Sequence, residues 1–138
     1  MSGGFVIDSS IGFSWVYPAQ ASRSTESLLQ ELEAGANVVV PELWFLEIAN
    51  GLLVLQRRKK LSAGERKEAL KTLMALNPIV DDESGKRAFD SISELAEKHS
   101  LTVYDAAYLE LAMRRNLPLA SRDESLLRAA RSAGVRSF

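Results

Sequence analysis

The sequence predicts an α/β protein: a three-layer α/β/α sandwich with a mostly parallel central sheet of four to five strands. Short apolar, β-branched runs alternate with longer segments of helical periodicity, which is the pattern of a parallel sheet covered by helices. The chain has 138 residues, of which 46% are hydrophobic and 25% charged, as in an average soluble domain. It contains no internal repeat, low-complexity run or linker. We therefore expect one domain over residues 1–138.

The expected strands are short apolar runs bounded by polar or turn-forming residues. In chain order they cover residues 5–7, 38–40, 78–80 and 117–120, with a last edge strand at 135–138.

The expected helices lie between these strands, at 11–17, 22–34, 42–58, 62–75, 84–98, 103–115 and 121–132. Ser62 with Glu65, and Ser121 with Glu124, have the spacing of a capping box. Thr102 is a good N-cap, and Pro41 fits the first turn of its helix, where the missing N–H costs little. The helix at 42–58 is apolar nearly all round, which predicts burial on most sides.

Composition excludes several kinds of site. The chain has no cysteine and one histidine, so disulfides, thiol catalysis, cysteine–zinc centres and multi-histidine metal sites are ruled out. Neither a dinucleotide-binding fingerprint nor a P-loop is present. A net charge of −1 gives no overall attraction to nucleic acid. Without a signal peptide pattern or a long apolar stretch, we expect a cytoplasmic protein with no membrane contact.

Four acidic residues stand where a site would form. Asp8 directly follows the first strand and Asp123 follows the strand at 117–120, so both belong to the carboxyl edge of the sheet. Asp105 lies in the first turn of a helix, and Glu47 lies inside the apolar helix. Taken singly, Asp8, Asp105 and Asp123 are explained at least as well by helix capping and the helix dipole.

Glu47 is harder to explain by local structure. It is too far from its helix start to act as a cap, and an unpaired buried carboxylate is costly. A salt bridge to a buried arginine or an exposed stripe on the helix would account for it. Asn50 and Gly51 share its helix face, which favours a floor open to a ligand.

Convergence of the four acids would raise their pKa values, because like charges repel. A divalent cation relieves that repulsion, and a ligand set of oxygens alone favours Mg²⁺ or Mn²⁺. Such a cluster supports metal-assisted hydrolysis of a phosphodiester.

Four segments carry a family resemblance, and each contains one of the acids. They read VIDSS at 6–10, VPEL with EIAN at 40–50, LTVYDAAY at 101–108 and ASRD at 120–123. Together and in this order they resemble the motifs of PIN-domain ribonucleases, most closely the VapC toxins. The resemblance runs from about residue 5 to residue 134.

The resemblance implies a PIN-like fold and a set of site residues. Asp8, Glu47, Asp105 and Asp123 match the quartet that holds Mg²⁺ or Mn²⁺ and performs catalysis. Ser10, Asn50 and Ser121 match positions that neighbour the acids, and Ser121 stands where the family usually has Thr. Arg122 lies between Ser121 and Asp123, a position from which it either contacts the substrate or pairs with a site acid.

The resemblance also implies a function. It is that of a metal-dependent endoribonuclease acting on structured RNA such as tRNA or rRNA and leaving a 5′-phosphate and a 3′-hydroxyl. Family members are usually homodimers inhibited by a cognate antitoxin.

Two other functions fit the same residues. A non-catalytic RNA-binding or interaction module of the same fold would hold no working metal. A phosphoacceptor receiver-like domain also has acids at strand ends, but it needs a late lysine, and this chain has none after Lys98.

The densest basic run is RRKK at 57–60, at the end of a predicted helix. It is either a solvated helix end, where cations favour the dipole, or a surface that grips phosphates.

Overall fold

The computed structural model describes residues 3–138 and has a four-stranded parallel sheet at its centre. The strand order is β3-β2-β1-β4. The strands are β1 (Gly4–Ile7), β2 (Asn37–Pro41), β3 (Ile79–Asp81) and β4 (Leu119–Ala120). The predicted fold class is confirmed, and the sheet has four strands. The predicted edge strand at 135–138 contributes only one bridge, between Ser137 and Leu119.

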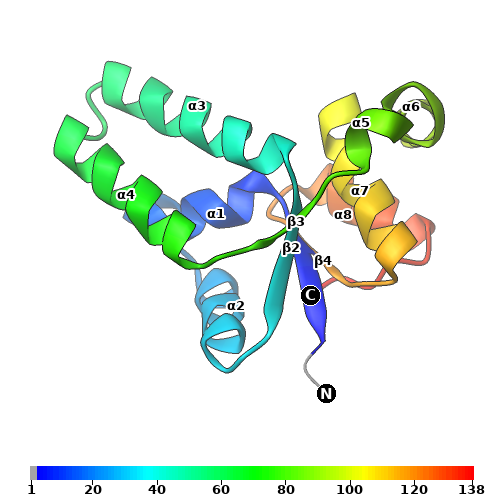
Figure 1. The fold of residues 1–138 in the computed structure, drawn as a ribbon, viewed down its shortest axis with the longest axis horizontal. Coiled ribbons are helices and arrows are strands. Elements are labelled where there is room, and N and C mark those ends of the chain that lie inside the picture. Colours follow the sequence, from blue (N-terminus) through cyan, green and yellow to red (C-terminus); the bar gives the residue numbers. More distant parts are fainter. Residues whose placement is uncertain (1–2) are drawn as a thin grey trace.

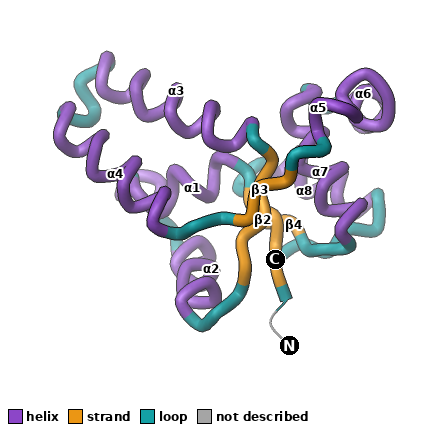
Figure 2. The backbone as a smooth tube through the Cα atoms, in the orientation of Figure 1, coloured by secondary structure: helices purple, strands orange, loops and turns teal. Residues whose placement is uncertain are grey.

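Helices cover both faces of the sheet, which gives the three predicted layers. Figures 1 and 2 show α1 to α4 on one side and α5 to α8 on the other. The helices are α1 (Ser9–Val16), α2 (Arg23–Glu33), α3 (Leu43–Arg57), α4 (Ala63–Ala75), α5 (Ser84–Arg87), α6 (Ser93–His99), α7 (Val103–Arg115) and α8 (Glu124–Ser132). No helix within residues 3–138 is both long and apolar enough to cross a membrane.

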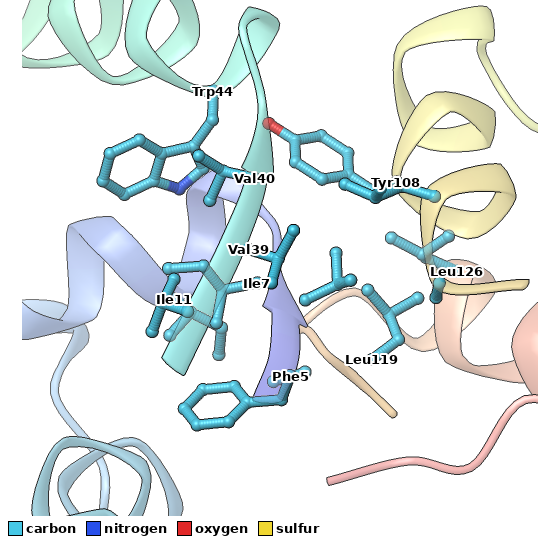
Figure 3. Packing of buried hydrophobic residues seen from close by; sticks show 14 of the residues in the cluster. Phe5, Ile7, Ile11, Val39, Val40, Trp44, Tyr108, Leu119 and Leu126 are labelled. Carbon is cyan, nitrogen blue, oxygen red and sulfur yellow. The ribbon is translucent and has the colours of Figure 1, made fainter. Parts of the chain in front are cut away.

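The sheet register brings the candidate acids to one edge. Val6 of β1 pairs with Val39 of β2 and with Leu119 of β4, so β1 is central. The core around it is apolar and closed; Phe5, Val6 and Ile7 are fully buried (Figure 3). Because all four strands are parallel, the residues that follow β1 and β4 meet at the carboxyl edge.

Several predicted helix starts are confirmed by their caps. Ser62 and Glu65 form the reciprocal capping box of α4. Thr102 caps α7, since its side chain accepts from the N–H of Asp105 at 3.0 Å.

Two predicted helix starts are wrong. The N-cap of α8 is Asp123, because its carboxylate accepts from the N–H groups of Ser125 and Leu126, and Ser121 is therefore free for another partner. Pro41 is the last residue of β2 and pairs with Asp81, and α3 begins only at Leu43.

The single helix predicted at 84–98 is also wrong, because the chain breaks it into three parts. A π-helical turn at Ala88–Ile92 separates α5 from α6, and Asp90 leaves helical geometry at φ −122° and ψ −108°. The change of direction lets Ile92 and Ala96 pack against Ala106 and Ala107 of α7. Hydrophobic periodicity within the segment does not reveal this contact, because the contact depends on the small residues of α7.

Burial of α3 on most sides is only partly correct. Trp44, Ile48 and Leu52 are buried, but Leu46 is 73% exposed and Ala49 and Asn50 are exposed as well. The helix packs on α1 and α4, and its opposite face is open.

Candidate active site

Asp8 is the anchor of the candidate site and has both carboxylate oxygens occupied. It stands at the end of β1 and caps α1, so its Oδ1 accepts from the N–H of Ile11 at 3.3 Å. The same oxygen accepts from the Ser10 hydroxyl at 2.6 Å, and Oδ2 accepts from the Ser121 hydroxyl at 2.5 Å. Capping and a place in the site are thus compatible roles for this residue.

Burial dominates the charge state of Asp8. The side chain is 4% exposed, and burial raises its pKa because the charged form loses water. Hydrogen bonds from Ser10, Ser121 and Ile11 pull the pKa back down, and the negative charge of Asp105 raises it further.

The loop after β4 closes the site from the other side. The Ser121 hydroxyl, besides donating to Asp8, accepts from the N–H of Asp123 at 2.9 Å. The N–H of Arg122 donates to the Ser10 hydroxyl at 2.9 Å. The guanidinium of Arg122 donates to the carbonyl of Gln20, and among residues 3–138 it forms no ion pair with a site acid. The two serines predicted near the acids therefore tie the loop to Asp8.

Glu47 is held by a residue that the sequence analysis did not single out. Its Oε1 accepts from the Tyr108 hydroxyl at 2.5 Å, and no salt bridge to an arginine forms among the described residues. Figure 3 shows the Tyr108 hydroxyl pointing from α7 toward the segment that leads into α3. Burial raises the pKa of Glu47 most, followed by the charges of Asp105 and Asp8. The available signal was spacing, because Tyr108 lies three residues after Asp105 on the same helix face.

Asp105 links the remaining acids. It lies in the first turn of α7, and its pKa is raised by burial and then by the negative charge of Asp123. Each of the four acids is therefore close enough to another for its charge to be felt. Asp8 and Asp123 follow β1 and β4 at the carboxyl edge of the sheet, and Glu47 and Asp105 lie close enough to other acids for their charges to raise the pKa values of both.

The acids suit a hard cation by chemistry but are not arranged around one. Within residues 3–138, no group of three or more acidic or histidine side chains is placed to hold a metal ion. Asp8, Glu47 and Asp123 each direct an oxygen to a hydroxyl or N–H donor of the chain itself. Carboxylate oxygens are nevertheless the ligands that Mg²⁺ and Mn²⁺ prefer.

The prediction that Gly51 forms part of a surface open to a ligand is wrong. A Cβ at this position would lie 2.1 Å from Cζ of Phe13, so the glycine serves the close packing of α3 on α1. Asn50 lies on the exposed part of α3, and in the described part of the chain its side chain makes no hydrogen bond to the acids.

Comparison with known proteins agrees with this geometry. The PIN domain family matches residues 5–132. A VapC ribonuclease of Mycobacterium bovis and ribonuclease VapC9 of Mycobacterium tuberculosis are each 32% identical over 109 residues, which cover 76% of this chain and 80% of each relative.

Solved structures share the fold at lower identity. PAE2754 from Pyrobaculum aerophilum has a TM-score of 0.75 and 19% identity, over 97% of this chain and 83% of its own. VapBC2 from Rickettsia felis, solved with a promoter DNA fragment, has a TM-score of 0.67 and 12% identity, over 98% of this chain and 97% of its own. The family match and the VapC relatives establish that the chain belongs to the PIN domain family.

Proposed function

We propose that this chain is a Mg²⁺- or Mn²⁺-dependent endoribonuclease, with Asp8, Glu47, Asp105 and Asp123 as its catalytic and metal-binding residues. The observation that carries this proposal is the placement of Asp8 and Asp123 after the neighbouring strands β1 and β4, with Glu47 and Asp105 close enough to interact with them electrostatically. Three of them have raised pKa values, caused by burial and by the charge of another acid. Such a cluster is unfavourable by itself and favourable once a cation balances it.

The chain's own residues would position the reaction. Ser10, Ser121 and the start of α1 fix the Asp8 carboxylate, and Tyr108 fixes that of Glu47. The divalent cation, when bound, would lower the pKa of an attacking water and offset the charge of the leaving oxygen. No side-chain nucleophile is needed, which suits a chain without cysteine.

The same proposal includes the biological setting of a toxin. The sequence relatives are VapC ribonucleases, and structural neighbours are complexes named VapBC2 and FitAB. An antitoxin protein is therefore the partner we propose. An apolar groove of about 300 Å³ between α3 and α4 suits an amphipathic helix from such a partner. A homodimer through the open face of α3 would cover Leu46.

The deciding experiment is cleavage of total RNA by the purified protein. We expect cleavage with Mg²⁺ or Mn²⁺, none with EDTA, and loss by at least 100-fold in Asp105→Asn. The products should carry a 5′-phosphate and a 3′-hydroxyl. Cleavage in EDTA, or a 2′,3′-cyclic phosphate product, would contradict the proposal.

The absence of a preassembled metal group in residues 3–138 favours one second candidate, a non-catalytic RNA-binding or interaction module of the same fold. A melting curve with increasing Mn²⁺ separates the two, because a ligand of the native state raises its stability. The nuclease should gain several degrees in Mn²⁺, and Asp105→Asn should gain little. A melting temperature independent of Mn²⁺, together with RNA binding but no cleavage, would support the module.

A further inference from the structure

Positive charge is concentrated at one end of the α3–α4 hairpin. Residues 57–67, which we call the basic tip, contain six cations and one acidic residue, a local net charge of +5 in a chain of net charge −1. Figure 1 shows this end of the hairpin at one extreme of the long axis, away from the sheet. The rest of the chain therefore has a net charge of −6.

The cations of the basic tip are not neutralised by the fold. Arg57, Arg58, Lys59 and Lys60 are all exposed, and none has an ion-pair partner within residues 3–138. Further along α4, Lys71 pairs with Glu68 at 3.9 Å, with both side chains exposed. By contrast, Arg114 contacts both Asp81 and Glu110.

The helix dipole explains only part of this run. Arg57 and Arg58 end α3, where a cation is favourable. Lys59 and Lys60 lead into α4, which starts at Ala63, and Arg66 and Lys67 lie early in that helix. The start of a helix carries positive partial charge, so cations there are unfavourable. A purely structural role does not account for them.

The basic tip lies on the same helix as Glu47, where it can attract the RNA backbone toward the acids. Arg57 lies ten residues after Glu47 on α3, roughly 15 Å along the helix axis at 1.5 Å per residue. The acids by themselves repel the phosphates of an approaching RNA. A positive surface on the same helix attracts that backbone and raises the rate of encounter.

We infer that the basic tip binds the sugar–phosphate backbone of the RNA substrate a few nucleotides from the cleavage site. The inference rests on the proposed ribonuclease function and adds to it the surface that holds the substrate. The contacts are electrostatic and independent of base sequence, so they contribute affinity and leave the choice of cleavage site to other residues.

The test is salt-dependent binding of fluorescein-labelled bulk tRNA, measured by anisotropy in EDTA so that no cleavage occurs. In Arg57→Gln/Arg58→Gln/Lys59→Gln/Lys60→Gln we expect at least tenfold weaker binding at 50 mM KCl. The slope of log Kd against log salt should fall by about 3, since each lost phosphate contact removes about 0.7 to 0.9. The double variant Lys59→Gln/Lys60→Gln should lose about half as much.

A matched control removes four exposed cations from the other side of the sheet, Lys86, Lys98, Arg128 and Arg131, each replaced by Gln. It has the same net charge as the tip variant, and we expect a change in affinity below twofold. Equal losses in the two variants, or no loss in either, would overturn the inference. Unchanged tRNA binding with lost binding of the co-expressed antitoxin would assign the tip to a protein partner and also overturn it.

This test separates the inference from the proposed function. The wild-type protein could cleave RNA with metal and yet show the same slope of log Kd against log salt as the tip variant. That result would refute only the role of the tip. A wild-type protein that binds no tRNA would refute the inference, and the cleavage experiment then decides the function by itself. Circular dichroism melts of all variants confirm that they are folded.

Discussion

The Tyr108 hydroxyl donates a 2.5 Å hydrogen bond to Oε1 of Glu47, joining α7 to α3 across 61 residues of sequence. Tyr108 is 1% exposed, and its pKa is raised by burial, by this bond and by the charges of nearby acids, so the phenol stays protonated and donates. A buried donor in a fixed position limits the directions that the Glu47 carboxylate can take.

Tyr108→Phe removes that donor and keeps the ring. We expect metal-dependent RNA cleavage to fall by about 10- to 100-fold, as for other groups that orient a metal-binding carboxylate. The affinity for Mn²⁺, measured by calorimetry, should fall in parallel, and the free energy of unfolding should drop by about 1–3 kcal/mol. Tyr104→Phe, which removes a 61% exposed tyrosine hydroxyl from the same helix, is the control. Undiminished Mn²⁺ affinity in Tyr108→Phe would show that Tyr108 does not orient Glu47.

Ser121 bridges two acids, and its hydroxyl should therefore matter more than its size. It donates to Asp8 and accepts from the N–H of Asp123, so Ser121→Ala releases both. We expect Ser121→Ala to lower cleavage by at least tenfold, and Ser121→Thr, which keeps the hydroxyl, to retain most of it. Initial rates on one labelled RNA measure both. Similar losses in Ala and Thr would indicate a packing effect instead.

Gly51 should tolerate no side chain where α3 crosses α1. In Gly51→Ala the new Cβ would press on the Phe13 ring, and overpacking of this kind costs about 1–3 kcal/mol. Gly64→Ala is the matched control, because a Cβ there meets only Ser62 Oγ at 3.9 Å, and it should stabilise by about 0.5–1 kcal/mol. Urea unfolding measures both. Adding Phe13→Leu should restore part of the stability lost in Gly51→Ala.

Asp81 forms a buried ion-pair group with Arg114 and Arg115. Arg114 donates to both of its carboxylate oxygens at 2.9 and 2.8 Å, and Arg115 donates to Oδ1 at 3.0 Å. The Arg114 hydrogen bonds are the largest cause that lowers the pKa of Asp81 from 3.8 to about 2. Asp81 is 1% exposed, so water cannot replace a hydrogen bond that the carboxylate loses.

The pH dependence of stability follows from that shift. The folded pKa lies below the unfolded one, so the stabilisation is present above about pH 4 and is lost as the pH falls toward 2. Its size is about 2 kcal/mol, from the shift of nearly two pKa values. Asp81→Asn should cost about 3 kcal/mol at pH 7 and flatten the stability curve between pH 4 and 2. Glu68→Gln, which breaks the exposed pair with Lys71, should change stability by less than about 0.5 kcal/mol. Denaturant titrations at several pH values measure these differences.

The sequence was a good guide wherever the signal is local. Hydrophobic runs located four strands, and Ser62 and Thr102 marked the starts of α4 and α7, because caps act over three residues. The position of Asp8 and Asp123 after two strands placed them at one edge, since parallel strands end together. Glu47 stood out because a carboxylate in an apolar helix needs a partner.

Tertiary structure decided what depends on residues far apart in the chain. Asp123 rather than Ser121 caps α8, and Ser121 reaches back 113 residues to Asp8. Gly51 faces Phe13 instead of a ligand, and the partner of Glu47 is Tyr108 rather than an arginine. Such choices are made by packing between helices and by competition among hydrogen-bond partners, which no local pattern encodes. Local sequence patterns located most of the strands and helices and the positions of the acids along them, because those signals span only a few residues. The packing of α1, α3 and α7 decided which groups the acids contact, because that packing joins residues far apart in the chain.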